Sequence, residues 1–374
     1  MQQLRQFIRG RTSIDLLTIS HFDDDHIAGV TELFRQVRVE ALMLPYVPLW
    51  ERLLIAFGKD LRPGDERFRF YINPGAFLRG IGGDNLGRII EVEPGGEDGP
   101  SFDSDGGDFP REPDLGEGPW KFKAKTKFRT AAEQSGNAAA ENDQQTETIA
   151  SGQPWTVQGL WEFCPYNAPR RDEISAGFKA NVEKMSDRLL HPPAGADLDA
   201  ELRALKKFYD DEFGDKARPR NVISLFLYSG PVYSTWNNHK ILSPDYATPS
   251  YYPGRYPCWY RVHAHAPGHS SKCSILYTGD GYLNTPKSFT SLNAALGSNR
   301  ITNLGVVQVP HHGAKGNWQP GLAAKLDPVF CVFSSDPARG PTYHPDAEVL
   351  RDFWPHIPVQ VNQAGASYCG WLQR

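Results

Sequence analysis

Apolar and polar stretches alternate along the N-terminal part of the chain in a way that predicts a strand, a loop and a helix. Residues 14–20 form a short apolar run of the kind found in buried strands. A polar cluster, residues 21–26, begins where that strand should end. In residues 28–37 the apolar side chains recur at helical spacing. This order of elements is typical of an α/β fold.

The second half of the chain continues the same pattern. Two helices are predicted between residues 172 and 215, because Pro192 and Pro193 must interrupt any helix there. Apolar runs predict four further strands, at residues 221–229, 274–280, 306–310 and 328–334. Periodicity alone therefore supports the α/β class and no finer description.

Two segments interrupt this pattern and are predicted to be insertions in a single domain that spans residues 1–374. Residues 91–152 are acidic and rich in Gly and Pro, which favours a flexible, solvated segment. Residues 231–269 are rich in aromatic side chains, which would wall a pocket, stack on bases or pack as a loop. Within the first segment, residues 119–130 alternate basic with apolar side chains, as an edge hairpin or a polyanion-binding strip would; an edge strand protected by Lys is favoured.

Composition changes this picture in three respects. With 374 residues, 40% of them hydrophobic, the chain has the size of an enzyme rather than of a small binding module. The net charge of -4 argues against one large basic surface for nucleic acid. Five scattered cysteines, with neither a signal peptide nor a membrane-spanning stretch, predict free thiols and a cytoplasmic protein that does not bind membranes.

Side chains that can bind metal gather at the predicted strand ends. In the first polar cluster, His21, Asp23 and Asp25 alternate, which can place them on one side of an extended loop, and His26 adjoins them. Mixed imidazole and carboxylate ligands suit Zn, Mn or Fe better than Ca. An ordinary acidic surface loop is the alternative interpretation.

Two later strand ends carry the same kinds of side chain. Asp280 ends the strand at residues 274–280 with a carboxylate that can bridge two cations, and His311 and His312 follow the next strand. Each motif alone is weak, because Asp after Gly is ordinary turn chemistry and paired histidines are often structural. Rigid strand ends are an effective way to bring distant ligands together, so the three motifs in combination predict a metal site.

Five motifs, in this order, resemble the metallo-β-lactamase superfamily of binuclear hydrolases, and within it the soluble domain of ComEC-type DNA-uptake proteins. They are SHFDDDHIAGV, NVISLFL, LYTGD, VPHHGAKGN and YHPDAEVL. The resemblance covers the core strands of nearly the whole chain but neither insertion. It implies an αββα sandwich, in which two packed β-sheets have helices outside.

The resemblance also implies a ligand set for two divalent metal ions, Zn or Mn. His21 and Asp23 would bind one ion, Asp25 and His26 the other, and Asp280 would bridge them. Two ions that share a bridging water lower its pKa towards neutrality and hold hydroxide in line with a phosphorus or carbonyl centre. Asp25 would also orient that water.

The paired histidines and a late histidine complete the implied site. His311 or His312 would fill the second metal site, and His311 is favoured because it is closer to the strand end. The remaining imidazole and His344 would face the substrate, His344 as a proton donor or phosphate-binding group. Lys315 and Asn317 would contact phosphate, although Lys315 serves equally well as a solvated loop residue.

The sequence departs from the family pattern at three places. Asp23 stands where many members have His, which shifts the preference towards harder metals such as Mn. The histidine expected before the strand at residues 274–280 is not obvious: Asn221 and Ser224 occupy its position, or one of three later histidines supplies it, His263, His265 or His269. Only about a dozen residues precede the first strand, where members have a strand pair, so a truncated product, or a partner chain or second copy that completes the sheet edge, is expected.

Three functions fit these observations. The resemblance favours hydrolysis of phosphodiester bonds in nucleic acid or a nucleotide. Hydrolysis of a lactam, lactone or other carbonyl ester is the second, because a fold does not fix the substrate. A binding or scaffold protein with a degenerate site is the third.

Overall fold

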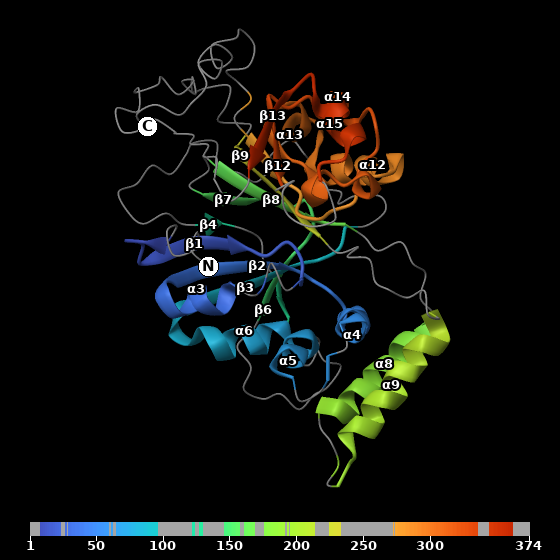
Figure 1. Ribbon diagram of the computed structural model, residues 1–374. Coiled ribbons are helices and arrows are strands. Elements are labelled where there is room, and N and C mark those ends of the chain that lie inside the picture. The colour runs from blue at the N-terminus through green and yellow to red at the C-terminus, as the bar shows by residue number, and fades with distance from the viewer. Residues whose placement is uncertain are drawn as a thin grey trace. The chain divides into compact units, whose positions relative to one another are not determined.

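The computed structural model describes residues 8–23, 27, 29–59, 61–62, 65–95, 122–123, 127–129, 146–157, 161–168, 176–190, 193, 195–213, 224–232, 272, 274–335 and 344–361 (Figure 1). Strands and helices alternate through these ranges, so the α/β class expected from the sequence is confirmed. The chain forms two compact units. Unit 1 comprises Met1–Pro94, Thr126–Ile149 and Pro169–Ile223, and unit 2 comprises Gly95–Lys125, Ala150–Ala168 and Ser224–Arg374. The single domain proposed from the sequence stays a prediction.

Unit 1 contains a five-stranded sheet of order β1-β2-β3-β6-β5. The first four strands are mutually parallel and β5 is antiparallel to β6. The bounds are β1 Ser13–Thr18, β2 Arg38–Pro45, β3 Leu86–Val92, β6 Thr146–Ile149 and β5 Lys127–Arg129. Side chains of a strand alternate between faces, and in β2 both Leu42 and Met43 are fully buried. Both faces of β2, an interior strand, are therefore withdrawn from water, as is usual in parallel sheets.

Helices flank this sheet and share its apolar core. Figure 1 shows α3 (Val30–Gln36), α5 (Glu66–Ile72) and α6 (Pro74–Gly82) beside the strands. Helix α4 (Leu49–Gly58) joins them, and its buried residues form one apolar cluster with Leu42 and Leu44 of β2. Burial of these apolar faces is the main stabilising contribution within unit 1.

The two helices predicted between residues 172 and 215 are α8 (Ala176–Leu190) and α9 (Leu198–Phe213). Helix α9 packs on α4 through Tyr209, whose ring lies edge-on 5.1 Å from that of Phe57 and whose hydroxyl donates to the carbonyl of Trp50. No helix in the described ranges has both the length and the apolar composition to cross a bilayer.

Unit 2 contains an eight-stranded mixed sheet of order β13-β12-β11-β10-β9-β8-β7-β4. Strands β10 to β13 are parallel, and the remaining pairs are antiparallel. The bounds are β13 Ile357–Val361, β12 Phe330–Ser334, β11 Leu304–Gln308, β10 Ser274–Tyr277, β9 Leu225–Pro231, β8 Trp161–Asn167, β7 Trp155–Val157 and β4 Phe122–Lys123. The strands expected after residue 220 are all found, with ends shifted by a few residues.

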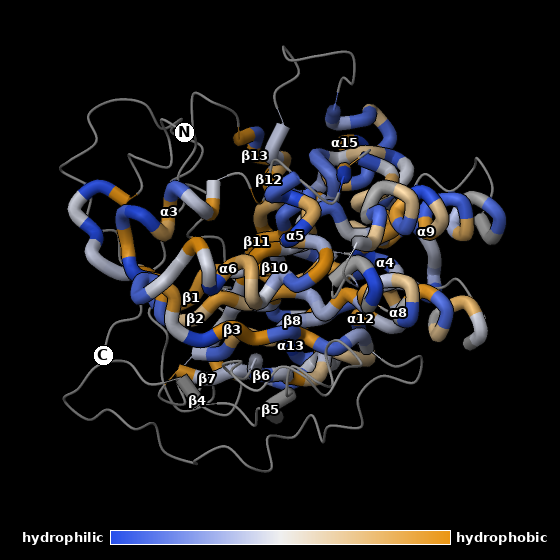
Figure 2. Tube along the Cα trace, turned by 90° about the horizontal axis from the view of Figure 1, so that it is seen from below, coloured by the Kyte–Doolittle hydropathy of each residue, from blue (hydrophilic) through white to orange (hydrophobic). Residues whose placement is uncertain are grey.

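Four helices cover the parallel part of this sheet: α12 (Pro286–Leu296), α13 (Ser298–Thr302), α14 (Leu322–Leu326) and α15 (Ala347–Phe353). Their buried residues cluster with those of β10, β11 and β12. Figure 2 shows the apolar residues concentrated along the central strands, with polar residues prominent on the helices.

The predicted insertion at residues 91–152 stays a prediction, and β6 lies inside its bounds. All four residues of β6 are buried although three are polar, and the carboxylate of Glu147 accepts from Arg88 Nε of β3 at 2.6 Å. The basic strip at residues 119–130 contains β4 and β5, which lie at the edges of two different sheets. The edge position predicted for this strip is confirmed. The predicted hairpin is wrong, because β4 and β5 belong to different sheets.

Two of the five cysteines, Cys164 and Cys331, are described, and both are buried free thiols. Burial raises the pKa of each thiol to about 12. Both therefore stay protonated and poorly reactive at neutral pH.

A buried ion pair in unit 2 provides a stability test. Arg300 of α13 donates to both carboxylate oxygens of Glu162 in β8, at 2.7 and 2.9 Å, and Glu162 is buried. Glu162→Ala leaves the arginine charge without its partner, so we expect the free energy of unfolding to fall by about 3 kcal/mol. Urea denaturation measures this change.

The double variant Glu162→Leu/Arg300→Met is the control for this pair. It removes both charges and keeps apolar volume, so it should be closer in stability to the wild type than the single variant. A double variant as unstable as Glu162→Ala would contradict the assignment of the loss to an unpaired buried charge.

Candidate metal centre

The first donor group lies in unit 1, directly after β1. His21 is almost fully buried, and its Nδ1 lies 2.9 Å from the hydroxyl oxygen of Ser20. Its other ring nitrogen, Nε2, lies 3.7 Å from Oδ2 of Asp23. A histidine whose one nitrogen is held by a neighbour presents the other in a fixed direction, as metal-binding histidines do.

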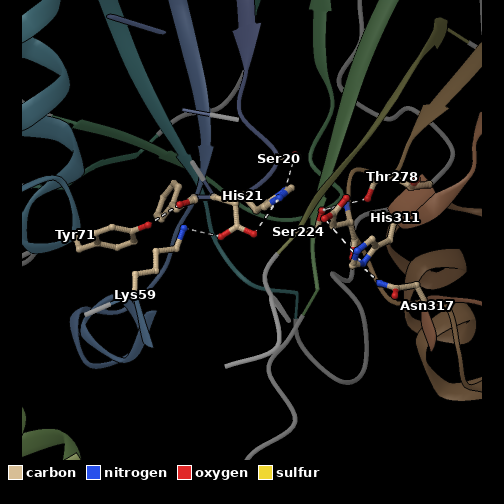
Figure 3. Close-up of polar contacts among 11 residues, drawn as sticks. Ser20, His21, Lys59, Tyr71, Ser224, Thr278, His311 and Asn317 are labelled. Carbon is tan, nitrogen blue, oxygen red and sulfur yellow. Dashed lines mark hydrogen bonds and ion pairs between the residues drawn. The ribbon is translucent and has the colours of Figure 1, made fainter. Parts of the chain in front are cut away.

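Two residues that the sequence analysis missed hold this loop, Lys59 and Tyr71 (Figure 3). Lys59, at the end of α4, places its Nζ 3.0 Å from Oδ1 of Asp23. The hydroxyl of Tyr71 in α5 donates to the carbonyl of Phe22 at 2.7 Å. Neither residue belongs to a sequence motif, and both reach the loop from more than thirty residues away, so no local pattern could have revealed them.

Several of the candidates from the sequence lie outside the described residues. These are Asp25, His26, Asn221, His263, His265 and His269. The role of Asp25 in orienting water and the identity of the extra histidine ligand stay predictions.

The second donor group lies in unit 2, where a turn after β10 carries Asp280. The Ser224 hydroxyl donates to the carbonyl of Thr278 at 3.2 Å and accepts from the backbone N–H of Asp280 at 3.1 Å. The Thr278 hydroxyl donates to the carbonyl of Gln308 at the end of β11. Ser224 is fully buried, and its hydroxyl supports the turn that carries Asp280.

The paired histidines form a turn with unusual backbone geometry after β11. His311 and His312 have φ of 45° and 59°, and Gly313 follows with φ of 88°. Left-handed backbone at a non-glycine residue is uncommon, and it clusters at functional sites. The backbone N–H of His311 donates to the carbonyl of Gly279 at 3.0 Å, which fixes this turn to the one that carries Asp280.

His311 lies beside Asp280 in unit 2, and the rings of His312 and His344 lie near the His311 ring. Nδ1 of His311 lies 4.0 Å from Oδ2 of Asp280, and the His311 ring is 6.1 Å from that of His344, centroid to centroid. Nδ1 of both rings is buried and makes no hydrogen bond within the described part of the chain. His312 differs, because its Nδ1 contacts the carbonyl of Ser334.

Asp346, at the start of α15, positions the segment that carries His344. Its Oδ2 accepts from the backbone N–H of Lys315 at 2.8 Å and lies 3.6 Å from Nδ1 of His344. Its own N–H donates to the carbonyl of Gly313 at 3.0 Å. Asp346 thus fixes the late His-Pro segment to the turn of the paired histidines.

The two phosphate-binding candidates have different surroundings. Lys315 has an exposed side chain beside the histidine turn. Asn317 is buried, and its amide nitrogen donates to the carbonyls of Asp280 and Gly281 at 2.8 and 3.3 Å (Figure 3). Asn317 therefore holds the Asp280 turn, and its predicted contact with phosphate gains no support from this geometry.

The spacing of the donor atoms fits a metal ion. Ligand atoms about 2.1 Å from one ion lie roughly 3 to 4 Å from each other. The separations of 3.7 Å in the His21–Asp23 pair and 4.0 Å in the Asp280–His311 pair agree with this, and both are too long for a hydrogen bond. Across the described ranges, no three His, Cys, Asp or Glu side chains form a complete ligand group. Each pair supplies two donor side chains, fewer than a protein metal site usually has.

Comparison with known proteins provides no family assignment. No protein-family model matches the sequence, and no curated protein matches it either.

Gly313 is the position at which the histidine turn is most sensitive to substitution. A Cβ there would lie 2.7 Å from Cβ of Pro345 and 2.9 Å from Phe333, at a φ that side chains rarely adopt. We expect Gly313→Ala to lower the free energy of unfolding by about 2 kcal/mol or more and to displace His344. Chemical denaturation measures the loss.

Gly316→Ala is the matched control, because a Cβ there would meet no atom within 4 Å. Its stability should stay within about 0.5 kcal/mol of the wild type. Equal stability of the two variants would contradict the tight packing assigned to the histidine turn.

Proposed function

We propose that the chain is a binuclear metal-dependent hydrolase that cleaves phosphodiester bonds in nucleic acid or a nucleotide. The observation that carries the proposal is the Asp280–His311 pair, at 4.0 Å, on two turns that left-handed backbone and hydrogen bonds fix at the ends of parallel strands. Strained backbone of this kind persists when the surrounding structure holds it in place.

The residues of both donor groups enter the proposed site. His21 and Asp23 would bind one ion, Asp25 and His26 the other, Asp280 would supply its carboxylate to both, and His311 would complete the second site. Only the order of the motifs in the sequence, which resembles that of metallo-β-lactamase-type hydrolases, relates the two groups to one centre. A pair of bound Zn or Mn ions supplies an activated water and neutralises charge on the substrate phosphate.

The same resemblance supports the finer fold proposal, an αββα sandwich in one domain. The burial of both faces of β2 agrees with strands that lie inside a layered fold.

The remaining polar residues handle protons and the substrate. If His312 carries its proton on Nδ1, towards the carbonyl of Ser334, its Nε2 is free to accept a proton. His344 protonates the leaving group, and Oδ2 of Asp346, 3.6 Å from its Nδ1, holds the ring in place. Lys315, whose side chain is exposed, contacts a phosphate of the substrate.

Metal analysis and a substrate panel test the proposed function. The purified protein should contain Zn or Mn, or gain activity when either is added, and should hydrolyse bis-p-nitrophenyl phosphate and at least one of single-stranded DNA, double-stranded DNA and RNA. Cleavage of only a chromogenic β-lactam would favour the carbonyl alternative. A protein without metal, and without activity after metal is added, would overturn both enzymatic interpretations in favour of a binding protein.

Two substitutions separate the residue roles. We expect Asp280→Ala to lower kcat by roughly a thousand-fold or more and to reduce the metal content, because it removes the bridging carboxylate. Lys315→Ala should mainly raise KM for phosphate substrates, by about tenfold, because it removes one charged contact made in both ground and transition states.

Asp211→Ala is the control for loss of a carboxylate, because Asp211 is exposed on α9. Its kinetics and metal content should equal those of the wild type. Unchanged turnover in Asp280→Ala would contradict the bridging role.

A further inference from the structure

Lys59 places a positive charge directly on a proposed metal ligand. Its Nζ lies 3.0 Å from Oδ1 of Asp23, and both side chains are largely withdrawn from solvent, at 23% and 21% exposure. The other oxygen of the same carboxylate, Oδ2, is the atom that lies 3.7 Å from Nε2 of His21. The carboxylate of Asp23 is therefore shared between an ammonium group and the imidazole of the proposed site.

The surroundings hold Lys59 in this position. Its backbone N–H donates to the carbonyls of Ile55 and Ala56, which closes the last turn of α4. Its Nζ also lies 6.0 Å from the centre of the Tyr71 ring, within reach of a cation–π interaction. The hydroxyl of Tyr71 donates a hydrogen bond to the carbonyl of Phe22. Tyr71 therefore contacts both the lysine and the loop that carries Asp23.

An ammonium group in this place has two opposing effects on a metal ion. It repels any cation that binds Asp23, and the repulsion is stronger in a partly buried site than in water. It also holds the carboxylate of Asp23 in one conformation when no ion is bound.

We propose that Lys59 is a resident counter-cation of Asp23 that lowers the affinity of this ligand group for divalent metal ions. The inference rests on the proposed function, because it takes Asp23 as a metal ligand. Lys59 is a positioning residue: it acts through Asp23 and sets how tightly the site retains its ion. A lysine with a merely structural task would have the opposite effect on removal, since a disordered ligand binds metal more weakly.

Isothermal titration of the full-length, metal-stripped chain with Mn²⁺ alone tests this inference. Lys59→Met removes the charge and keeps most of the side-chain volume, so we expect Mn²⁺ to bind about tenfold or more tightly than to the wild type. Lys59→Arg retains the charge, and its affinity should stay within about threefold of the wild type. Asp23→Asn should abolish the binding step that Lys59→Met strengthens.

Lys272→Met is the matched control for loss of one lysine charge. Nζ of Lys272 lies 2.6 Å from Oδ2 of Asp327 in unit 2. Its substitution by Met should therefore leave the Mn²⁺ affinity unchanged. Thermal unfolding verifies that each variant is folded, and Lys59→Gln replaces Lys59→Met if the latter does not fold.

The outcomes separate this inference from the function on which it rests. Tighter binding by Lys59→Met, or binding by that variant alone, supports it. Equal or weaker binding by a folded Lys59→Met, or tightening by Lys59→Arg, overturns it and leaves the proposed function intact. Absence of Mn²⁺ and Zn²⁺ binding in every protein overturns the proposed function and this inference together.

Discussion

One hydrogen bond, from the backbone N–H of His311 to the carbonyl of Gly279, fixes the positions of Asp280 and His311 relative to each other in unit 2. It joins the turns that follow two neighbouring parallel strands, β10 and β11. Because the turns are fixed to each other, Asp280 and His311 lie close although thirty residues separate them in the sequence. Buried polar groups around the turns, Ser224 and Asn317 among them, satisfy the backbone that this arrangement leaves outside the sheet.

Local sequence patterns predicted the parts of the fold that depend on local chemistry. The strand, loop and helix of the first forty residues and the helix pair broken by Pro192 and Pro193 follow from apolar spacing and from proline geometry. The buried polar strand β6 was missed because its burial depends on a partner, Arg88 of β3, that no local window contains. A strand of polar sequence can be buried when a residue distant in the sequence neutralises the charge of its side chain.

The residues of the candidate site likewise divide into those that local sequence patterns revealed and those that only the structure revealed. Its motif residues were found because His and Asp at strand ends are unusual in a local window, and the structure brings Asp280, His311 and His344 together in unit 2, and His21 with Asp23 in unit 1. Lys59 and Tyr71 were missed, and Asp346 was part of a motif but was given no role, because the importance of each comes only from what it contacts. Positioning residues of this kind become visible only when the chain is folded.

The central proposal is that Asp280 and His311 bind metal, and that the motif residues His21 and Asp23 bind the same pair of ions. Anomalous diffraction from crystals grown with Mn²⁺ tests it most directly, because it places each ion without assumptions about activity. The account predicts two anomalous peaks, with Asp280 in contact with both ions and with His21 and Asp23 in contact with one of them. An ion bound by Asp280 that neither His21 nor Asp23 contacts, or a single peak remote from Asp280, would contradict it.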